Sequence, residues 1–364
     1  MAIRPYGQIV GNIRPNRKRV CIYVRKLTEK QNYMMLLRGE QPEWVPRYTF
    51  APDPDGTPVA ACTVGPALLL SHFTDPGPSR DIWGVTHIPV PEAGGTKMPE
   101  PNHFILKDIR KWRDVIRAPD LEGIDWEAMA KKDINELRVS RENTALVLSI
   151  MAEPFLKLVA FMGFSEGLCA MYEEPEEVTA LLEYVTDFTM EVGEKCIDHY
   201  KPDIFGIADD TATWKNPFFS PGMYRELIKP HHARMARLAT ERGIPVEMHC
   251  CGRCEDFIDD WLDFGVVSWN PAQTSNDLAE IKRKYGRGLV INGGWDSAAA
   301  LQAPDVSEMA VKLSVRDSID RYAPGGGYAF TGGFLGPLDD GITNRKNRWI
   351  SEEVRSYGAD FYRR

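Results

Sequence analysis

Apolar residues along the chain fall into short continuous runs that alternate with stretches of helical spacing. The runs predict strands at 44–50, 145–151, 204–208, 245–250, 266–270, 288–292 and 328–331, with a further strand near 64–70. Between them the spacing predicts helices at 28–37, 175–200, 220–243 and 304–322, the third kinked at Pro230. Strands that are each followed by a helix indicate parallel βα units.

Seven or eight such units without a dinucleotide-binding loop favour an α/β fold, a (β/α)8 TIM barrel with an N-terminal extension. A doubly wound fold of two domains is the alternative. We expect residues 1–44 to form the extension, a hairpin-like arm followed by a helix, and residues 45–364 to form the catalytic barrel. The arm would suit contact with a partner subunit, so a homo-oligomer is one expected assembly. Residues 72–125 are rich in Pro and Gly and are expected to lie over the barrel mouth.

Charge and composition narrow the range of partners. The formal net charge is −8, which disfavours a nucleic acid as partner. No run of 18 apolar residues is present, so the sequence predicts no membrane span. The seven cysteines are odd in number and mostly scattered, which does not resemble a disulfide framework and favours a reducing cytoplasm.

The chemistry is concentrated at residues 245–254, where one imidazole and three thiols lie within six positions. Alternate residues of an extended strand point the same way, so His249 and Cys251 should share a side while Cys250 faces the packing. Cys254 falls in the first turn of the next helix and could reach the same point. Imidazole and thiolate together are typical ligands of zinc. The alternatives are a metal-free strand end with buried thiols and a purely structural zinc.

Other polar residues follow the remaining strands, whose C-terminal ends share one mouth in a parallel barrel. Asp210 and Glu153 are candidate catalytic acids, although helix capping would also explain either of them. His231 and His232 are expected to lie at the surface or in packing. Candidate contacts to a substrate are Trp83, His87, Asp209, Asn292, Trp295 and Phe334.

Several segments, taken in order, resemble the uroporphyrinogen decarboxylase superfamily, whose fold is a (β/α)8 barrel. They are 27–46 (LTEKQNYMMLLRGEQPEWVP), 81–85, 207–211 with 220–231, 249–252, 265–267 and 292–296. The true decarboxylases carry an N-terminal segment rich in Arg, Gln and Gly that holds a tetrapyrrole. Residues 44–50 lack that motif, so decarboxylation of a porphyrinogen is not expected.

The His-x-Cys-Gly form at 249–252 is similar to the corrinoid-dependent methyltransferase branch. This resemblance implies Zn²⁺ and a separate corrinoid-binding (cobalamin) protein as partner. The O-demethylase members move a methyl group from a small methoxylated aromatic to Co(I), and the start of this chain looks more like theirs. The alternatives are a methylcobalamin:thiol methyltransferase and a decarboxylase-like barrel without metal.

One departure from that branch concerns the third zinc ligand. Thiol-methylating members supply a Cys near the last strand, and the matching stretch 331–334 has none. The candidates to replace it are Cys254, Glu153, Asp209, Asp210 and Glu247. Glu247 shares the strand parity of His249, so the predicted metal ligands are His249, Cys251, Cys254 and Glu247. The alternative to polarisation by a metal is that Asp210 or Glu153 donates a proton to the leaving oxygen.

Overall fold

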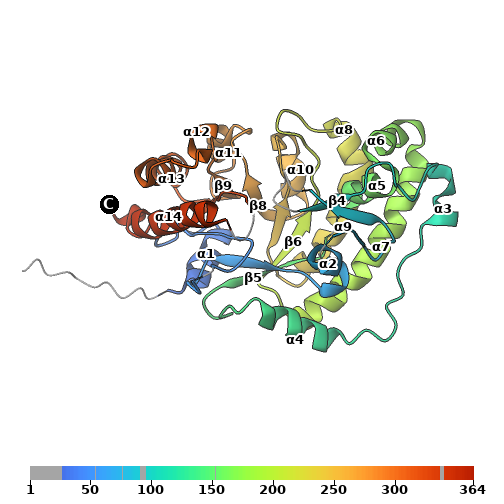
Figure 1. Ribbon diagram of the computed structural model, residues 1–364, viewed down its shortest axis with the longest axis horizontal. Coiled ribbons are helices and arrows are strands. Elements are labelled where there is room, and N and C mark those ends of the chain that lie inside the picture. The colour runs from blue at the N-terminus through green and yellow to red at the C-terminus, as the bar shows by residue number, and fades with distance from the viewer. Residues whose placement is uncertain (1–26, 54, 76, 91–95, 152, 337–339) are drawn as a thin grey trace, which may run out of the picture.

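The computed structural model describes residues 27–364 except 54, 76, 91–95, 152 and 337–339 (Figure 1). The predicted arm at 1–26 lies outside the described residues. Seven strands pair in parallel in the order β1-β5-β6-β7-β8-β9-β10. Their bounds are β1 (Ala61–Val64), β5 (Ala145–Ser149), β6 (Ile204–Ala208), β7 (Val246–His249), β8 (Val266–Ala272), β9 (Val290–Gly294) and β10 (Tyr328–Thr331).

Residues 46–50 join the two edges of this sheet. On one side the Phe330 N–H donates to the Pro46 carbonyl and the Tyr48 N–H donates to the Phe330 carbonyl, both at 2.9 Å. On the other side the segment pairs with residues 60–63, which include most of β1. The backbone N–H groups of Ala60, Thr49 and Thr63 donate to the carbonyls of Arg47, Ala61 and Phe50, respectively. The residue numbers increase in the same direction on both segments, so this pairing is parallel. Eight parallel segments therefore close into a barrel, which confirms the predicted (β/α)8 fold.

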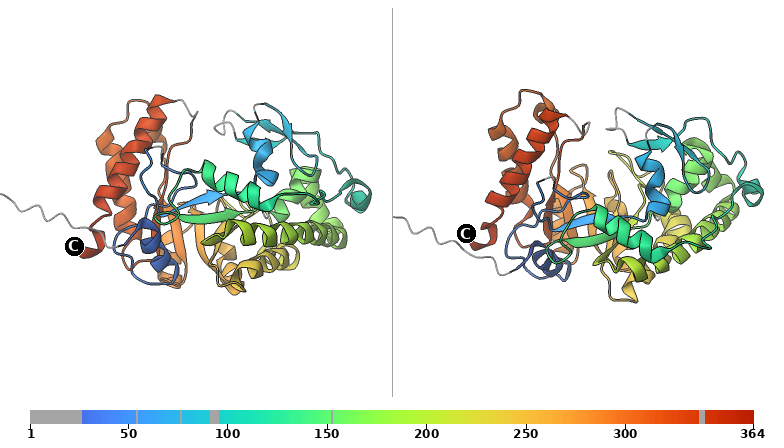
Figure 2. Two further views of the ribbon diagram at one scale, coloured as in Figure 1. Left: turned by 90° about the horizontal axis from the view of Figure 1, so that it is seen from below. Right: turned by 60° about the horizontal axis from the view of Figure 1, so that its bottom comes forward.

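Helices lie around the outside of the barrel in Figures 1 and 2. They are α1 (Glu29–Leu37), α2 (Ala67–Thr74), α3 (Trp112–Val115), α4 (Trp126–Glu136), α5 (Pro154–Met162), α6 (Phe164–Glu173), α7 (Pro175–Tyr200), α8 (Pro221–Met223), α9 (Lys229–Thr240), α10 (Ile258–Asp263), α11 (Leu278–Tyr285), α12 (Ala299–Gln302), α13 (Glu308–Tyr322) and α14 (Gly341–Tyr357). Short helical turns are η2 (Ile109–Lys111), η3 (Tyr224–Ile228), η4 (Glu255–Phe257) and η5 (Phe361–Arg363).

The barrel interior is filled from the strands and from α1. Thr28 and Gln31 form a capping box at the start of α1, which fixes the helix at the end of the extension. Its Tyr33 and Leu36 are fully buried and pack in one cluster with inward residues of the strands, which are Ala61, Ala145, Val147, Ile204, Val290 and Ala329. These small and β-branched residues leave room in the barrel for the side chains of Tyr33 and Tyr48, whose hydroxyls donate hydrogen bonds to Asn292 and Glu247.

Two expected elements differ from the observed ones. The strand expected near 64–70 is wrong: β1 ends at Val64, and the following apolar run forms α2 after Pro66. A continuous apolar run does not distinguish a strand from a buried helix, and Pro66 lacks the N–H that a strand needs. The kink expected at Pro230 takes the form of a π-helical segment, η3, directly before α9, because a proline cannot make the usual helical hydrogen bond.

The excursion at 72–125 contains a small antiparallel sheet, ordered β2 (Ser79–Arg80), β3 (Thr86–Pro89) and β4 (Lys97–Pro99). Figure 2 shows this sheet, in cyan, beside α2 and apart from the red helices α13 and α14. It forms a wall on one side of the barrel. The space between this wall and the barrel contains a cavity that is described below.

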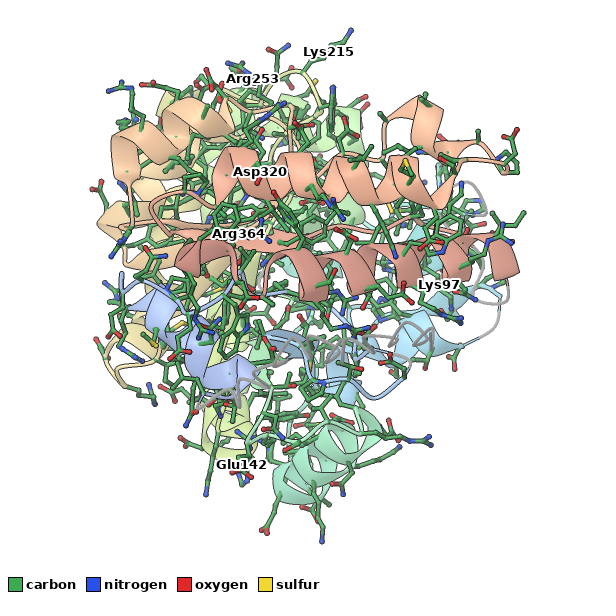
Figure 3. All side chains as sticks on the ribbon, turned by 90° about the vertical axis from the view of Figure 1, so that its left-hand side faces the viewer. Lys97, Glu142, Lys215, Arg253, Asp320 and Arg364 are labelled. Carbon is green, nitrogen blue, oxygen red and sulfur yellow. The ribbon has the colours of Figure 1, made fainter. Side chains whose placement is uncertain are left out.

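Charged side chains cover the outer helices in Figure 3, where Asp320 and Arg364 are labelled near α13 and α14. The Tyr357 hydroxyl donates to Asp320, and the Arg364 guanidinium lies 4.2 Å from the centre of the Tyr357 ring. Within the described residues no single helix is long and apolar enough to span a bilayer. Taken together, α5 and α6 are long and apolar enough, but the two helices are bent by 111° relative to each other.

Candidate active site

The ends of β6 and β7 bring Asp210, His249 and Cys251 together at the barrel mouth. The two strands pair in register with Ala208 opposite His249, so the residues that follow each strand are neighbours. His249 Nε2 lies 3.8 Å from Cys251 Sγ and 4.0 Å from Asp210 Oδ1. The Cys251 N–H donates to Asp210 Oδ1 at 2.7 Å, which fixes the carboxylate. One nitrogen, one sulfur and one oxygen thus lie within 4.8 Å of one another, and we call these three residues the donor cluster.

Asn270 orients the imidazole of His249 through a hydrogen bond to the ring nitrogen that faces away from the donor cluster. His249 Nδ1 lies 2.7 Å from Asn270 Oδ1, and the amide nitrogen of Asn270 donates to the Tyr48 hydroxyl at 3.4 Å. Because the amide oxygen accepts, Nδ1 carries the proton and Nε2 presents its lone pair to the donor cluster. Phe50 packs edge-on against the same ring, with centroids 5.6 Å apart.

Burial, with a smaller contribution from Asp210, raises the pKa of the Cys251 thiol. A thiolate therefore forms at neutral pH only when a positive charge is close by, and a bound metal ion supplies such a charge. The donor cluster fits zinc, which accepts nitrogen, sulfur and carboxylate ligands and uses three protein ligands in catalytic sites.

Glu247 lies in the barrel interior, outside the donor cluster. Its carboxylate accepts hydrogen bonds from the Tyr48 hydroxyl at 2.7 Å, from the Asn292 amide at 3.0 Å and from the Ser268 hydroxyl at 3.2 Å. Burial raises its pKa to about 7, against the opposing effect of these donors. Asn292 in turn accepts from the Tyr33 hydroxyl at 3.0 Å. Both residues are engaged with the core, so the structure does not place Asn292 against a substrate cleft.

Cys254 is likewise not brought to the donor cluster. Its side chain is fully buried, and its thiol lies 3.6 Å from the backbone oxygens of Cys250 and Gly252. Gly252 has a φ of 86°, and a side chain there would lie 2.5 Å from the Thr213 carbonyl oxygen. This tight turn directs Cys254 into the packing beneath the mouth.

Asp209 caps a helix from inside the core. Its carboxylate accepts from the N–H groups of Phe155 and Leu156, both at 3.0 Å, at the start of α5. His232 Nε2 approaches the same carboxylate at 3.1 Å, and His232 Nδ1 lies 2.9 Å from the Tyr224 hydroxyl. Asp209 therefore caps α5, and His232 is buried beside it.

The remaining four candidate substrate residues fall into two separate spaces. A cleft of about 610 Å³ at the barrel mouth, the mouth cleft, is lined by Tyr48, Phe50, Trp295 and Phe334, among others. Trp295 and Phe334 meet edge to face, with ring centroids 5.3 Å apart. Tyr48 and Phe50 connect this cleft to the donor cluster through Asn270 and His249.

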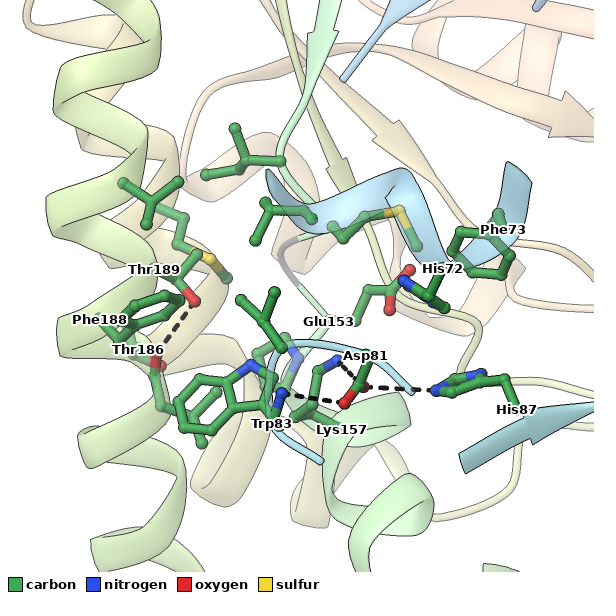
Figure 4. A pocket seen from close by; sticks show the side chains of 18 residues that line it. His72, Phe73, Asp81, Trp83, His87, Glu153, Lys157, Thr186, Phe188 and Thr189 are labelled. Carbon is green, nitrogen blue, oxygen red and sulfur yellow. Dashed lines mark hydrogen bonds and ion pairs between the residues drawn. The ribbon is translucent and has the colours of Figure 1, made fainter. Parts of the chain in front are cut away.

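The second space is an inner cavity of about 50 Å³ between the barrel and the wall (Figure 4). It is lined by Trp83, His87 and Glu153, with apolar residues of α2 and α7. Glu153 directly precedes α5, but its side chain makes no capping hydrogen bond, because Asp209 already holds those amides. Burial raises the pKa of Glu153 to about 8, against the Lys157 ammonium and with a contribution from Asp209 and Asp210.

Comparison with known proteins agrees with this architecture. A family model described as uroporphyrinogen decarboxylase (URO-D) matches residues 90–339. The chain belongs to the uroporphyrinogen decarboxylase family. A structure of a methyltransferase from Methanosarcina mazei superposes with a TM-score of 0.65 at 14% identity, over 91% of this chain and 99% of that one.

A further structural match to this uroporphyrinogen decarboxylase family protein is weaker. A putative vitamin-B12 independent methionine synthase from Listeria monocytogenes has a TM-score of 0.34 at 11% identity, over 59% of this chain and 64% of that one. Among curated proteins, no sequence matches significantly.

Several contacts of the site could not be read from the sequence of this family member. The hydrogen bonds of Tyr48 and Asn270 join strands far apart in sequence, which no local pattern reveals. Lys157 had a usable signal: it lies four residues after Glu153 across the first turn of α5, a spacing that places two side chains on one face.

With zinc added to the donor cluster of this family protein, Asn270→Leu is expected to bind it about 10- to 100-fold more weakly than the unaltered chain, the usual effect of removing the partner that orients a metal-binding histidine. The His249 ring would then be free to turn and to change its tautomer. Competition titration with a zinc chelator measures the change, with Ser275→Ala as a control outside the donor cluster. Unchanged affinity in Asn270→Leu would show that His249 needs no such support.

Glu153→Gln is expected to increase the stability of the folded protein at alkaline pH. In the folded protein the pKa of Glu153 is raised from 4.5 to about 8, because burial disfavours the ionised carboxylate. The free energy of unfolding therefore decreases as the pH rises above 4.5, and this loss is complete above pH 8. Glutamine stays neutral throughout. Thermal unfolding at pH 5 and pH 8 should show the advantage of the variant growing by a few °C. A constant difference between the two values would contradict the raised pKa.

Proposed function

We propose that this protein is a zinc-dependent methyltransferase that moves a methyl group from a methoxylated aromatic compound to the Co(I) corrinoid of a partner protein. The observation that carries the proposal is the donor cluster, in which nitrogen, sulfur and oxygen donors converge at the barrel mouth beside an open aromatic cleft. The fold shared with the Methanosarcina mazei methyltransferase is compatible with this chemistry.

The residues present fit the metal. His249, Cys251 and Asp210 would hold zinc, with the remaining position open to the substrate oxygen. Bound there, zinc would act as a Lewis acid that stabilises the negative charge developing on the ether oxygen. This chemistry is needed because phenoxide is a poor leaving group. The hydrogen bonds from His249 Nδ1–H to the Asn270 amide oxygen and from the Cys251 N–H to Asp210 orient two of the three metal-binding side chains in advance.

The mouth cleft supplies the space for the aromatic ring. Its volume of about 610 Å³ is within the usual range for sites that bind small molecules. Trp295, Phe334 and Phe50 offer ring faces and edges that pack against an arene. The cleft opens at the mouth, so the methyl carbon would remain accessible to a second protein while the oxygen end faces the donor cluster.

Glu153 supplies a proton in this proposal. With a pKa of about 8, its carboxyl group is largely protonated at neutral pH. Asp210 of the donor cluster contributes to this raised pKa, which supports a position of Glu153 close to the reacting oxygen. A neutral carboxylic acid there would act as a general acid and protonate the oxygen as the methyl group leaves. Asp210 is then left to the donor cluster, where its oxygen is fixed by the Cys251 amide.

The test is a methyl-transfer assay on protein purified without chelator. Zinc content is measured first, and the protein is then incubated with cob(I)alamin and a panel of methoxybenzoates and methoxyphenols. We expect near-stoichiometric zinc, formation of methylcobalamin and an equal amount of the phenol. Equal rates before and after removal of the metal would contradict the zinc site. Methylation of a thiol from methylcobalamin, without any demethylation, would instead assign the thiol methyltransferase activity.

A further inference from the structure

The inner cavity contains two histidines that the proposed chemistry does not use (Figure 4). His72 on α2 and His87 on β3 are each only 7% exposed, and their ring centres lie 4.6 Å apart. Within the part of the chain that the structure describes, His72 Nε2 and His87 Nδ1 are buried without a hydrogen-bond partner. Buried polar atoms usually have a partner, so two bare ring nitrogens on the wall of one cavity require an explanation.

Both nitrogens are hydrogen-bond acceptors. His87 Nε2 lies 3.3 Å from Asp81 Oδ2, and since a carboxylate only accepts, Nε2 donates and the neutral ring has its lone pair on Nδ1. Burial lowers the pKa of His72 to about 4, so that ring is neutral, and it also bonds to the backbone of Leu69. The missing partners are therefore donors.

The size of the cavity decides which donors fit. A volume of about 50 Å³ holds on the order of three or four water molecules, since each needs roughly 10–15 Å³ of such space. It is too small for a substituted aromatic ring in this conformation. Water supplies the donors that both histidines lack, and Glu153 lines the same cavity.

We propose that this cavity holds a short chain of water molecules, anchored by His72 and His87, which returns a proton from bulk solvent to Glu153 after each turnover. The proposal rests on the acid role of Glu153 in the proposed function. In that role the Glu153 O–H bond breaks as the proton passes to the leaving oxygen. The resulting carboxylate takes a proton from the nearest water, and the chain recovers one proton from bulk solvent, so one proton enters for each methyl ether cleaved.

The charged groups around the cavity favour such a path. Lys157 and Asp81 lie 3.6 Å apart, and of the two Lys157 has the stronger effect on Glu153, where it lowers the pKa. Asp209 and Asp210 oppose Lys157 and disfavour a lasting negative charge on Glu153, which promotes its reprotonation. Phe73 also lines the cavity and is 36% exposed, so the cavity reaches towards solvent at α2.

A comparison of single and multiple turnovers tests the path. The first turnover uses the proton already on Glu153, so His72→Leu should leave the single-turnover rate within about twofold. Steady-state turnover should fall about tenfold or more, because recharging becomes slow, and a small weak acid such as imidazolium in the buffer should restore it. His72→Gln keeps an acceptor and is the matched control, with near-normal turnover expected. An equal fall in both phases, or a fall in neither, would overturn the proposal.

A second measurement does not depend on catalysis. A high-resolution crystal structure of the full chain should show ordered water within hydrogen-bond distance of His72 Nε2 and of His87 Nδ1. The water at residue 72 should be lost in His72→Leu and kept in His72→Gln. A dry cavity in the unaltered protein would overturn the proposal even if methyl transfer occurs. Ordered water in a protein that transfers no methyl group would reject the proposed function and the proton delivery, while leaving the hydrated cavity.

Discussion

Replacing His249 with alanine is expected to remove bound zinc and to lower methyl transfer on the order of 10²- to 10³-fold, the usual loss when a group that stabilises developing charge is removed. His249 supplies the nitrogen donor, and its Nε2 lies within 4.0 Å of both other members of the donor cluster. Cys251→Ala and Asp210→Ala should behave similarly, because each leaves only two protein ligands. Metal analysis of the purified variants and the demethylation assay measure both effects.

Two cysteines serve as controls for this prediction. Cys254→Ala removes a thiol three residues from Cys251 that lies outside the donor cluster, and Cys169→Ala removes an exposed one. Both variants should keep a full complement of zinc. Loss of zinc in Cys254→Ala, with retention in Asp210→Ala, would assign the third position to sulfur. Full activity in both His249→Ala and Cys251→Ala would remove the metal from the proposed mechanism.

Glu153→Gln is expected to lower demethylation about 10²- to 10⁴-fold, the range typical of a lost general acid. The acid form is the active one, so the rate of the unaltered protein should be level below pH 8 and fall towards tenfold per pH unit above it. In the variant this alkaline fall should disappear. The variant isolates proton donation because glutamine keeps a similar size and leaves the donor cluster intact.

The leaving group provides the control for this second prediction. A methoxyarene with a strongly electron-withdrawing ring substituent releases a stable phenoxide and needs little protonation. The defect in Glu153→Gln should therefore shrink on such a substrate, while that of His249→Ala should remain. Equal defects on both classes of substrate would assign Glu153 a structural role. An unchanged pH profile in the variant would assign the titration to another group.

The barrel could be predicted from the sequence because each βα unit has its own local pattern of apolar and polar residues. The strands predicted at 204–208 and 328–331 match β6 and β10. Each is a short apolar run next to a helix of clear periodicity, a pattern that predicts a buried strand. The strand at 64–70 failed at Gly65 and Pro66, where an apolar run continues through a break into α2. The segment at 44–50 was recognised as strand-like, but its pairing with both β1 and β10 follows only from the closed sheet.

The candidate site was only partly accessible from the sequence, because its geometry depends on neighbouring strands. Alternation along β7 placed His249 and Cys251 on one side, and the structure brings their side chains within 3.8 Å. The choice among Asp210, Cys254 and Glu247 required the register of β6 against β7 and the turn at Gly252. The split of Trp83 and His87 from Trp295 and Phe334 depends on where the small sheet lies, which the sequence of 72–125 does not specify.

The pairing of residues 46–50 with β10 has a consequence for biosynthesis. Tyr48 leaves the ribosome long before its backbone partner Phe330, which is far later in the sequence. Until then the nascent chain exposes two open sheet edges, at residues 46–50 and at the most recent strand, and such edges are prone to pair with other chains. Shielding by chaperones during translation should therefore matter more for this protein than for one whose terminal strands pair locally. A chain truncated before β10 should be recovered as aggregate.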